Sequence, residues 1–228
     1  MRSVIDDINS NNSNLEKYIE NNKDNEKNEN INVENNKIID NMEYKVIFSG
    51  NCGSGAKTSL ISRFVNNKFE EHCQSTCSCY SSSLNVEADL GIINLQLWDT
   101  PGQELYRSLT NLFSKDSHCA ILGFDITNYD SFNEIKEFRY NDIIKVNGND
   151  ILIYLVANKI DLGVNEELDK EAMEYAKKKN IKYFKISSKT GEGVNLLLKD
   201  ISNSLIRKYR NTLDVNDIKI KGNSIKKL

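Results

Sequence analysis

The segment EYKVIFSGNCGSGAKTSLISRF, residues 43–64, joins an apolar run to a helix-like stretch through a glycine-rich turn. Glycines allow positive φ angles, so successive N–H groups of such a turn point at phosphate oxygens, and the following helix adds its positive end. In this pattern a lysine reaches the β- and γ-phosphates, and the next hydroxyl coordinates Mg²⁺. The segment therefore predicts a phosphate-binding loop (P-loop), with these contacts assigned to Gly53, Gly55, Lys57, Thr58 and Ser59.

The spacing of this loop is irregular by one residue, because Ala56 stands between Gly55 and Lys57. Either the loop contains one extra residue, or Ala56 replaces the last glycine and the turn begins later, with Asn51 at the first-glycine position. Both interpretations keep Lys57 and Thr58 at the start of the helix. We favour the extra residue, since the sequence from Lys57 onward continues correctly into a helix. Taken alone, the loop is also compatible with a turn that binds nothing.

The rest of the chain alternates apolar runs with helix-length polar segments, which is typical of an α/β fold with a mostly parallel sheet covered on both faces. Two of the runs are separated by the short stretch 89–91 and predict a hairpin with one antiparallel strand. Strands are predicted at 43–49, 82–88, 92–98, 118–125, 151–157 and 181–186, and helices at 58–67, 103–114, 129–146, 165–179 and 191–208.

Composition excludes several classes of protein. The chain has 228 residues, 30 basic against 33 acidic, and a net charge of −3, so nucleic acid is not an expected partner. Five cysteines, an odd number, and a polar beginning without a secretory signal predict reduced thiols in a cytoplasmic protein. A run of eighteen apolar residues, which a membrane span would need, is missing.

The chain divides into three regions by composition. Residues 1–42 hold thirteen asparagines and are expected to form a disordered extension, because they cannot bury enough apolar surface. Residues 43–208 are the predicted folded domain. Residues 209–228 are expected to be a basic flexible tail, and without a lipid acceptor their attraction to an anionic membrane would be weak.

Three further motifs follow predicted strands. In WDTPGQE, residues 98–104, Asp99 can hold magnesium, the Gly102 N–H can meet a terminal phosphate, and Gln103 can orient an attacking water. In NKID, residues 158–161, the Asp161 carboxylate can accept two hydrogen bonds from guanine, a donor pair that adenine lacks. Asn158 would brace this site and the stem of Lys159 would lie across the ring. Backbone N–H groups for the guanine carbonyl are assigned to Ser187, Ser188 and Lys189.

The order of these motifs resembles that of the Ras superfamily of small GTPases, and within it the Rab family. WDTPGQE resembles the WDTAGQE of that family, and GFDITNYDSF, residues 123–132, resembles its YDITxxxSF. The resemblance covers about 43–208. It implies the six-stranded small-GTPase fold, binding of GDP or GTP with Mg²⁺, slow GTP hydrolysis, and contacts with exchange factors, activating proteins and effectors through two switch segments.

By the same resemblance, Thr76 falls at the magnesium-binding threonine of the first switch, and Phe69 at the aromatic residue beside the guanine. The magnesium ligands would be Thr58, Thr76 and Asp99. Of the three aromatic residues that the family presents to effectors, Trp98 and Phe113 are matched and Ser81 occupies the third position. Cys77-Ser78 replaces the Ile-Gly that follows the switch threonine.

Two departures bear on activity and location. Pro101 replaces the alanine before Gly102, and its fixed φ should hinder the second switch and slow hydrolysis. Prenylation cysteines are missing near the C-terminus, and Arg2 excludes myristoylation at that position, so only peripheral association with endomembrane vesicles is expected.

These observations lead to one main hypothesis and two rivals. The main one is a Rab-type GTP switch in vesicle trafficking, in which Lys57 and Mg²⁺ neutralise developing charge and Gln103 places water. The first rival is a guanine-nucleotide-binding scaffold that does not hydrolyse GTP. The second, an ATP-using P-loop enzyme, is disfavoured by Asp161.

Overall fold

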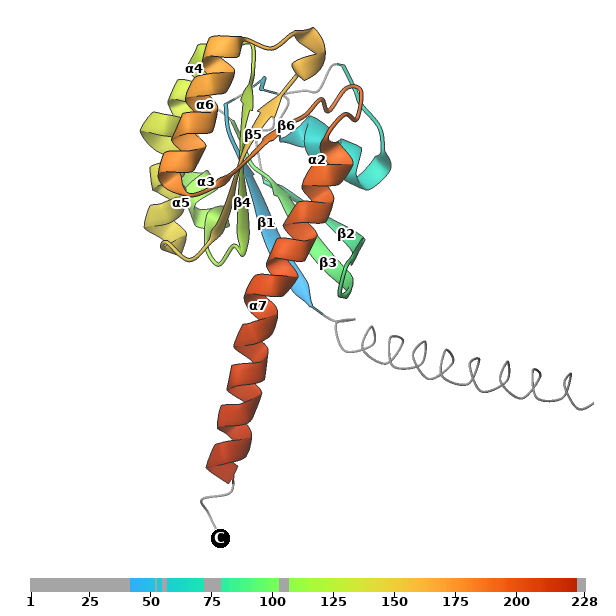
Figure 1. Ribbon diagram of the computed structural model, residues 1–228, viewed down its shortest axis with the longest axis vertical. Coiled ribbons are helices and arrows are strands. Elements are labelled where there is room, and N and C mark those ends of the chain that lie inside the picture. The colour runs from blue at the N-terminus through green and yellow to red at the C-terminus, as the bar shows by residue number, and fades with distance from the viewer. Residues whose placement is uncertain (1–41, 52, 55–56, 72–78, 103–106, 225–228) are drawn as a thin grey trace, which may run out of the picture.

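The computed structural model describes residues 42–51, 53–54, 57–71, 79–102 and 107–224. They form a six-stranded sheet with helices on both faces (Figure 1), which confirms the predicted α/β class. The strand order is β2-β3-β1-β4-β5-β6. The strands are β1 (Glu43–Ser49), β2 (Tyr80–Ala88), β3 (Gly91–Asp99), β4 (Cys119–Asp125), β5 (Leu152–Asn158) and β6 (Lys182–Lys185).

Strands β2 and β3 form the predicted hairpin, with Asp89 and Leu90 in the turn between them. This is the antiparallel pair of the sheet, and β2 is an edge strand. Strand β1 pairs in parallel with β3 and β4, and β5 pairs in parallel with β4 and β6. The carboxyl ends of these parallel strands therefore meet at one edge of the sheet, where ligands bind in open α/β folds.

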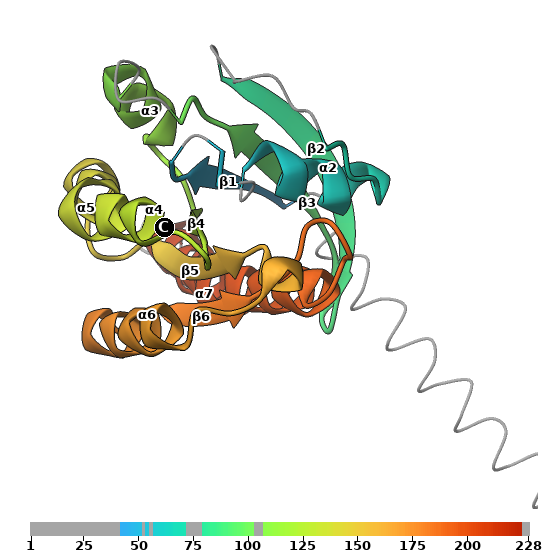
Figure 2. The same cartoon turned by 90° about the horizontal axis from the view of Figure 1, so that it is seen from above.

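The two faces of the sheet bury separate cores, because successive residues of a strand point to opposite sides. Val46 and Phe48 of β1 belong to the core under α2 and α7, while Ile47 belongs to the core under α4, α5 and α6 (Figure 2). The helices are α2 (Thr58–Asn66), α3 (Arg107–Ser114), α4 (Tyr129–Glu134), η2 (Ile135–Arg139), α5 (Tyr140–Asn147), η3 (Ile160–Leu162), α6 (Glu166–Lys179) and α7 (Val194–Ser224).

Two helices differ from their predicted form. The helix expected at 129–146 contains a π turn, η2, between α4 and α5. The helix expected to end near 208 continues as α7 to Ser224, well into the expected tail. Its sequence there lacks proline, and its first glycine is Gly222, so no strong helix breaker stands at the expected end. Residues 1–41, at the N-terminus, lie outside the described part.

A polar clasp joins α7 to the β2–β3 turn. The Asp89 N–H donates to Asn203 Oδ1 at 2.9 Å, and Asn203 Nδ2 donates to Asp89 Oδ2 at 2.8 Å. Lys199 Nζ lies 3.4 Å from the same carboxylate. Within the described residues, the helices are all too short or too polar to cross a bilayer.

Candidate nucleotide-binding site

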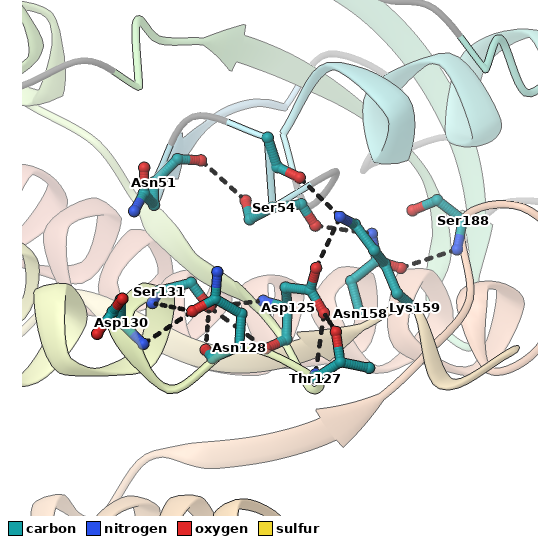
Figure 3. A network of polar contacts seen from close by, with 11 residues as sticks. Asn51, Ser54, Asp125, Thr127, Asn128, Asp130, Ser131, Asn158, Lys159 and Ser188 are labelled. Atoms are coloured by element: carbon teal, nitrogen blue, oxygen red, sulfur yellow. Dashed lines mark hydrogen bonds and ion pairs between the residues drawn. The ribbon is translucent and has the colours of Figure 1, made fainter. Parts of the chain in front are cut away.

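Most of the predicted site residues lie at or just beyond the carboxyl ends of β1, β3, β5 and β6. Figure 3 shows part of this cluster, with Ser54 of the loop after β1 lying beside Asn158, the last residue of β5, and Lys159, which follows it. The segments are far apart in sequence, and the parallel sheet brings them together. Each loop contributes a different polar group.

The loop after β1 packs tightly against β4. A Cβ built at Gly50 would lie 2.2 Å from the Gly123 carbonyl oxygen, so any larger residue would collide with that strand. Ser54 Oγ donates to the Asn51 carbonyl at 3.0 Å and closes the turn. Gly53 has a φ of 77°, which favours glycine. The local sequence therefore folds this segment as a compact turn.

Lys57 lies directly before the first residue of α2 and is only 6% exposed. Its Nζ donates to the Gly50 carbonyl at 3.0 Å and to the Asn51 carbonyl at 2.7 Å. The Lys57 side chain thus links the end of the loop to its beginning. Gly55 and Ala56 lie outside the described residues, so both interpretations of the irregular spacing remain open.

Thr58 and Asp99 meet although 41 positions separate them. The Thr58 hydroxyl donates to Asp99 Oδ2 at 2.6 Å, and Asp99 is 6% exposed at the end of β3. A hydroxyl and a carboxylate oxygen beside a phosphate-binding loop are the hard oxygen donors that Mg²⁺ takes alongside nucleotide phosphates. These two residues fit a magnesium site, and they would hold the ion. Thr76, the third predicted ligand, lies outside the described residues.

Asn158 connects the phosphate loop to the loop after β6. The side chain is 1% exposed, its Nδ2 lies 3.4 Å from the Ser54 carbonyl, and its Oδ1 accepts from the Ser188 N–H at 2.9 Å. Both ends of the buried amide are therefore satisfied within the protein. The predicted bracing role of Asn158 is consistent with this geometry.

Asp161 is exposed, and its Oδ1 accepts a hydrogen bond from the Ser187 hydroxyl at 2.5 Å. Ser187 is fully buried, and its oxygen also accepts from the Thr190 N–H at 3.0 Å. The donor and acceptor capacity of this hydroxyl is thus used to hold the carboxylate in one orientation. The charged group that was predicted to recognise guanine is held at the surface of the site.

A family model described as Ras family matches residues 45–207 of the chain. The match spans the sheet, the phosphate-binding loop, the Thr58–Asp99 pair and the Asn158–Asp161 loop. The chain belongs to the Ras family. Members of the Ras family are small GTP-binding proteins, and in general they bind guanine nucleotide with Mg²⁺ and act as GTPases.

Two serines of this Ras-family chain that were predicted to meet the guanine carbonyl have partners within the protein. The Ser187 N–H donates to the Glu192 carbonyl at 3.0 Å, and the Ser188 N–H donates to Asn158. Both N–H groups are therefore hydrogen-bonded within the protein in this structure, and their contact with the guanine carbonyl stays a prediction. Ser187 braces Asp161 and Ser188 braces Asn158. Lys189, the third residue of that prediction, is exposed.

Asp125 is a residue of the candidate site that the sequence analysis missed. It ends β4, and its Oδ2 lies 2.7 Å from Lys159 Nζ, which also donates to the Gly53 carbonyl at 2.7 Å. Thr127 donates to the other oxygen through its N–H at 2.9 Å and its hydroxyl at 2.7 Å. Burial alone would raise the pKa of the Asp125 carboxyl, but these bonds outweigh burial and hold the pKa below its ordinary value. The sequence signal that could have identified Asp125 is its position in GFDIT, residues 123–127, at the end of a predicted strand.

Arg63 of α2 was also missed. Its Nε donates to the Ser188 carbonyl at 2.9 Å and its Nη2 to the Lys189 carbonyl at 2.6 Å. The guanidinium therefore fastens the loop after β6 to the helix that begins at the phosphate-binding loop. A lone arginine in a helix gives little sequence signal for such a role.

The structure also describes part of the predicted second switch and of the predicted effector surface. Pro101 and Gly102 are buried after β3, and Gln103 lies outside the described residues. Trp98 stacks on Phe113 with ring centroids 5.8 Å apart. Ser81, at the third effector position, is exposed and pairs with Trp98 across the hairpin. Ser59 is buried in α2, and Phe69 is partly buried beyond it.

Proposed function

We propose that this protein is a Rab-type switch that binds GDP and GTP, hydrolyses GTP slowly with Mg²⁺, and works in vesicle trafficking. The observation that carries the nucleotide and magnesium part is the contact between the Thr58 hydroxyl and the Asp99 carboxylate beside Lys57. The Rab assignment and the trafficking role rest on the two motifs, WDTPGQE and GFDITNYDSF.

Each residue would act through simple chemistry. Lys57 would place its cation against the phosphates, and Thr58 and Asp99 would hold magnesium, which neutralises phosphate charge when it is bound. Asp161 would accept the two guanine donors, and Gln103 would orient the attacking water. Exchange factors, activating proteins and effectors would bind the switch segments and the Trp98–Phe113 surface, on a cytoplasmic protein that associates peripherally with vesicle membranes.

The decisive test is to release and identify the nucleotide that the purified full-length protein carries. We expect guanine nucleotide in the wild type and little in Lys57→Ala, because the main phosphate cation is gone. Lys68→Ala, which changes an exposed lysine beyond α2, should carry as much as the wild type. A wild-type protein that carries no nucleotide, and takes up none when offered Mg²⁺ with GDP or GTP, would overturn the proposal.

A second candidate is a guanine-nucleotide-binding scaffold without hydrolysis. Pro101, buried at the start of the second switch, favours it, because proline restricts the backbone that must rearrange. Single-turnover GTP decay separates the two candidates. The switch predicts faster decay in the wild type than in Gln103→Leu, whereas equal rates would favour the scaffold.

A further inference from the structure

The π turn η2 carries a charged side chain on the face that packs into the core. Phe132, Ile135 and Ile143 on this face are 0–1% exposed, and Arg139 among them is 2% exposed. An apolar residue would be expected there, because a buried guanidinium is costly unless it is paired and hydrogen-bonded. The partners of Arg139 therefore indicate what it does.

The first partner is Glu134, at the end of α4. Arg139 Nε donates to Glu134 Oε1 at 2.7 Å, and Nη2 lies 2.5 Å from the same oxygen. Residues five apart do not face each other in a regular α-helix, whereas a π turn winds more widely and brings such residues together. The π turn thus builds this ion pair and fixes the direction of the guanidinium.

The second partner is the backbone of Gly102, 37 positions earlier. Arg139 Nη2 donates to the Gly102 carbonyl at 3.0 Å. On the other side of Gly102, the Pro101 carbonyl lies 3.4 Å from the Thr110 hydroxyl, a longer contact. Because a peptide unit is planar, holding a carbonyl also sets the direction of the N–H in the same unit. The peptide units on both sides of the Gly102 Cα are therefore held by side chains.

These contacts limit the backbone rotation of Gly102, which would otherwise be the most mobile residue of the segment. Glycine has the widest backbone freedom, and Pro101 before it has a fixed φ. With Arg139 holding the next carbonyl, rotation on the far side of Gly102 is restricted as well. The Gly102 N–H is the group that the WDTPGQE motif predicts to meet a terminal phosphate.

We propose that Arg139, oriented by Glu134, is a positioning residue that holds Gly102 ready to bind the terminal phosphate of a nucleoside triphosphate. A donor that is fixed before binding loses less freedom on binding, so the affinity gain applies to the triphosphate and not to the diphosphate. This inference rests on the proposed function, since it concerns the same pocket.

The test compares equilibrium binding of fluorescent GDP and of a non-hydrolysable GTP analogue, both with Mg²⁺, to full-length wild type and Arg139→Leu. We expect about ten-fold weaker binding of the analogue by Arg139→Leu, as loss of one hydrogen bond to a charged group would give, with GDP binding nearly unchanged. Lys136→Leu is the matched control. Lys136 lies on the same π turn as Arg139, and the substitution breaks its ion pair with Glu171 of α6. We expect this variant to leave the ratio of the two affinities unchanged.

Two results would overturn the proposal: an unchanged ratio of the two affinities, whether or not both nucleotides bind more weakly, or tighter binding of the analogue. Equal weakening would indicate a purely structural arginine. If Arg139→Leu does not fold, Glu134→Gln keeps the shape and should shift the ratio in the same direction by less, and an unchanged ratio there would also overturn the proposal. A wild type that binds neither nucleotide would refute the proposed function itself, which is a distinguishable outcome.

Discussion

Asp161 and Ser187 show how a charged group is held at the surface of the candidate base site. Ser187 is fully buried and uses its hydroxyl to orient the Asp161 carboxylate. A carboxylate held in one position can discriminate between purines, because the wrong base leaves its charge without matching donors. The selectivity proposed for this site therefore depends on one side chain.

We expect Asp161→Asn to lower the preference for guanine over other purine nucleotides by about ten-fold or more, because the amide replaces one acceptor with a donor. A competition assay between guanine and adenine nucleotides measures the change. Asp130→Asn alters an exposed carboxylate on α4 and should leave the preference as it is. Unchanged selectivity in Asp161→Asn would remove this residue from base recognition.

At the residue scale, motif spacing led to Thr58, Asp99, Asn158 and Asp161, which lie in the loops that the sheet brings together. It did not identify how Ser187 and Ser188 use their hydrogen bonds, nor the roles of Asp125 and Arg63. The Ser188 N–H finds its acceptor 30 positions away, and Arg63 finds its acceptor 125 positions away. Such pairings depend on the three-dimensional arrangement, and local sequence carries no signal for them.

At the element scale, β1 and α2 are joined by a loop that leaves no room for a side chain at its start. The Gly50 Cα faces the backbone of β4, as the 2.2 Å approach to the Gly123 carbonyl oxygen shows. The loop can therefore keep its path only if the residue after β1 is glycine. This requirement links the position of the phosphate-binding loop to the packing of two neighbouring strands.

Gly50→Ala should lower the free energy of unfolding by about 1–3 kcal/mol, because β1 and β4 must move apart to admit the methyl group. The same movement should speed the release of bound nucleotide. Urea unfolding and the dissociation rate of a fluorescent nucleotide measure the two effects. Gly148→Ala, after α5, strains only a backbone with a φ of 76° and should leave the dissociation rate unchanged. Wild-type behaviour of Gly50→Ala in both assays would contradict the packing argument.

The order and type of the elements were predictable because apolar runs and helix signals alternate clearly along the chain. The π turn was not, because the segment 129–146 reads as an ordinary amphipathic helix and Arg139 looks like a solvated residue in it. The end of α7 was misplaced for a different reason. The basic composition after 208 suggested a tail, but nothing in that sequence before Gly222 strongly opposes helix.

At the scale of the whole molecule, an ion pair ties together the ends of two neighbouring strands and the phosphate loop. Asp125 ends β4, Lys159 directly follows β5, and Lys159 donates to the Gly53 carbonyl. The low pKa of Asp125 means that the folded state favours its ionised form. Its contribution to stability is therefore complete above the pKa of the unfolded chain and is lost as the pH falls through the folded-state pKa.

Asp125→Asn should lower the free energy of unfolding at pH 7 by about 1–3 kcal/mol, because Lys159 loses a charged partner. The difference in the free energy of unfolding between wild type and variant should narrow as the pH falls below about 4, since the wild-type carboxyl then becomes neutral too. Urea unfolding at a series of pH values measures this difference. Glu137 is an exposed residue of η2, and Glu137→Gln should have almost the same free energy of unfolding as the wild type at every pH. A difference between wild type and Asp125→Asn that stays constant down to acidic pH would contradict the prediction.

The clasp between Asp89 and Asn203 has a mechanical consequence for the whole protein. The hairpin β2–β3 lies in sequence between the two predicted switch segments, and its turn is hydrogen-bonded to the long helix α7. Any sliding of the hairpin against β1 must either break this clasp or tilt the helix with it. Movement of α7 is thus coupled to the two strands that lie between the predicted switch segments.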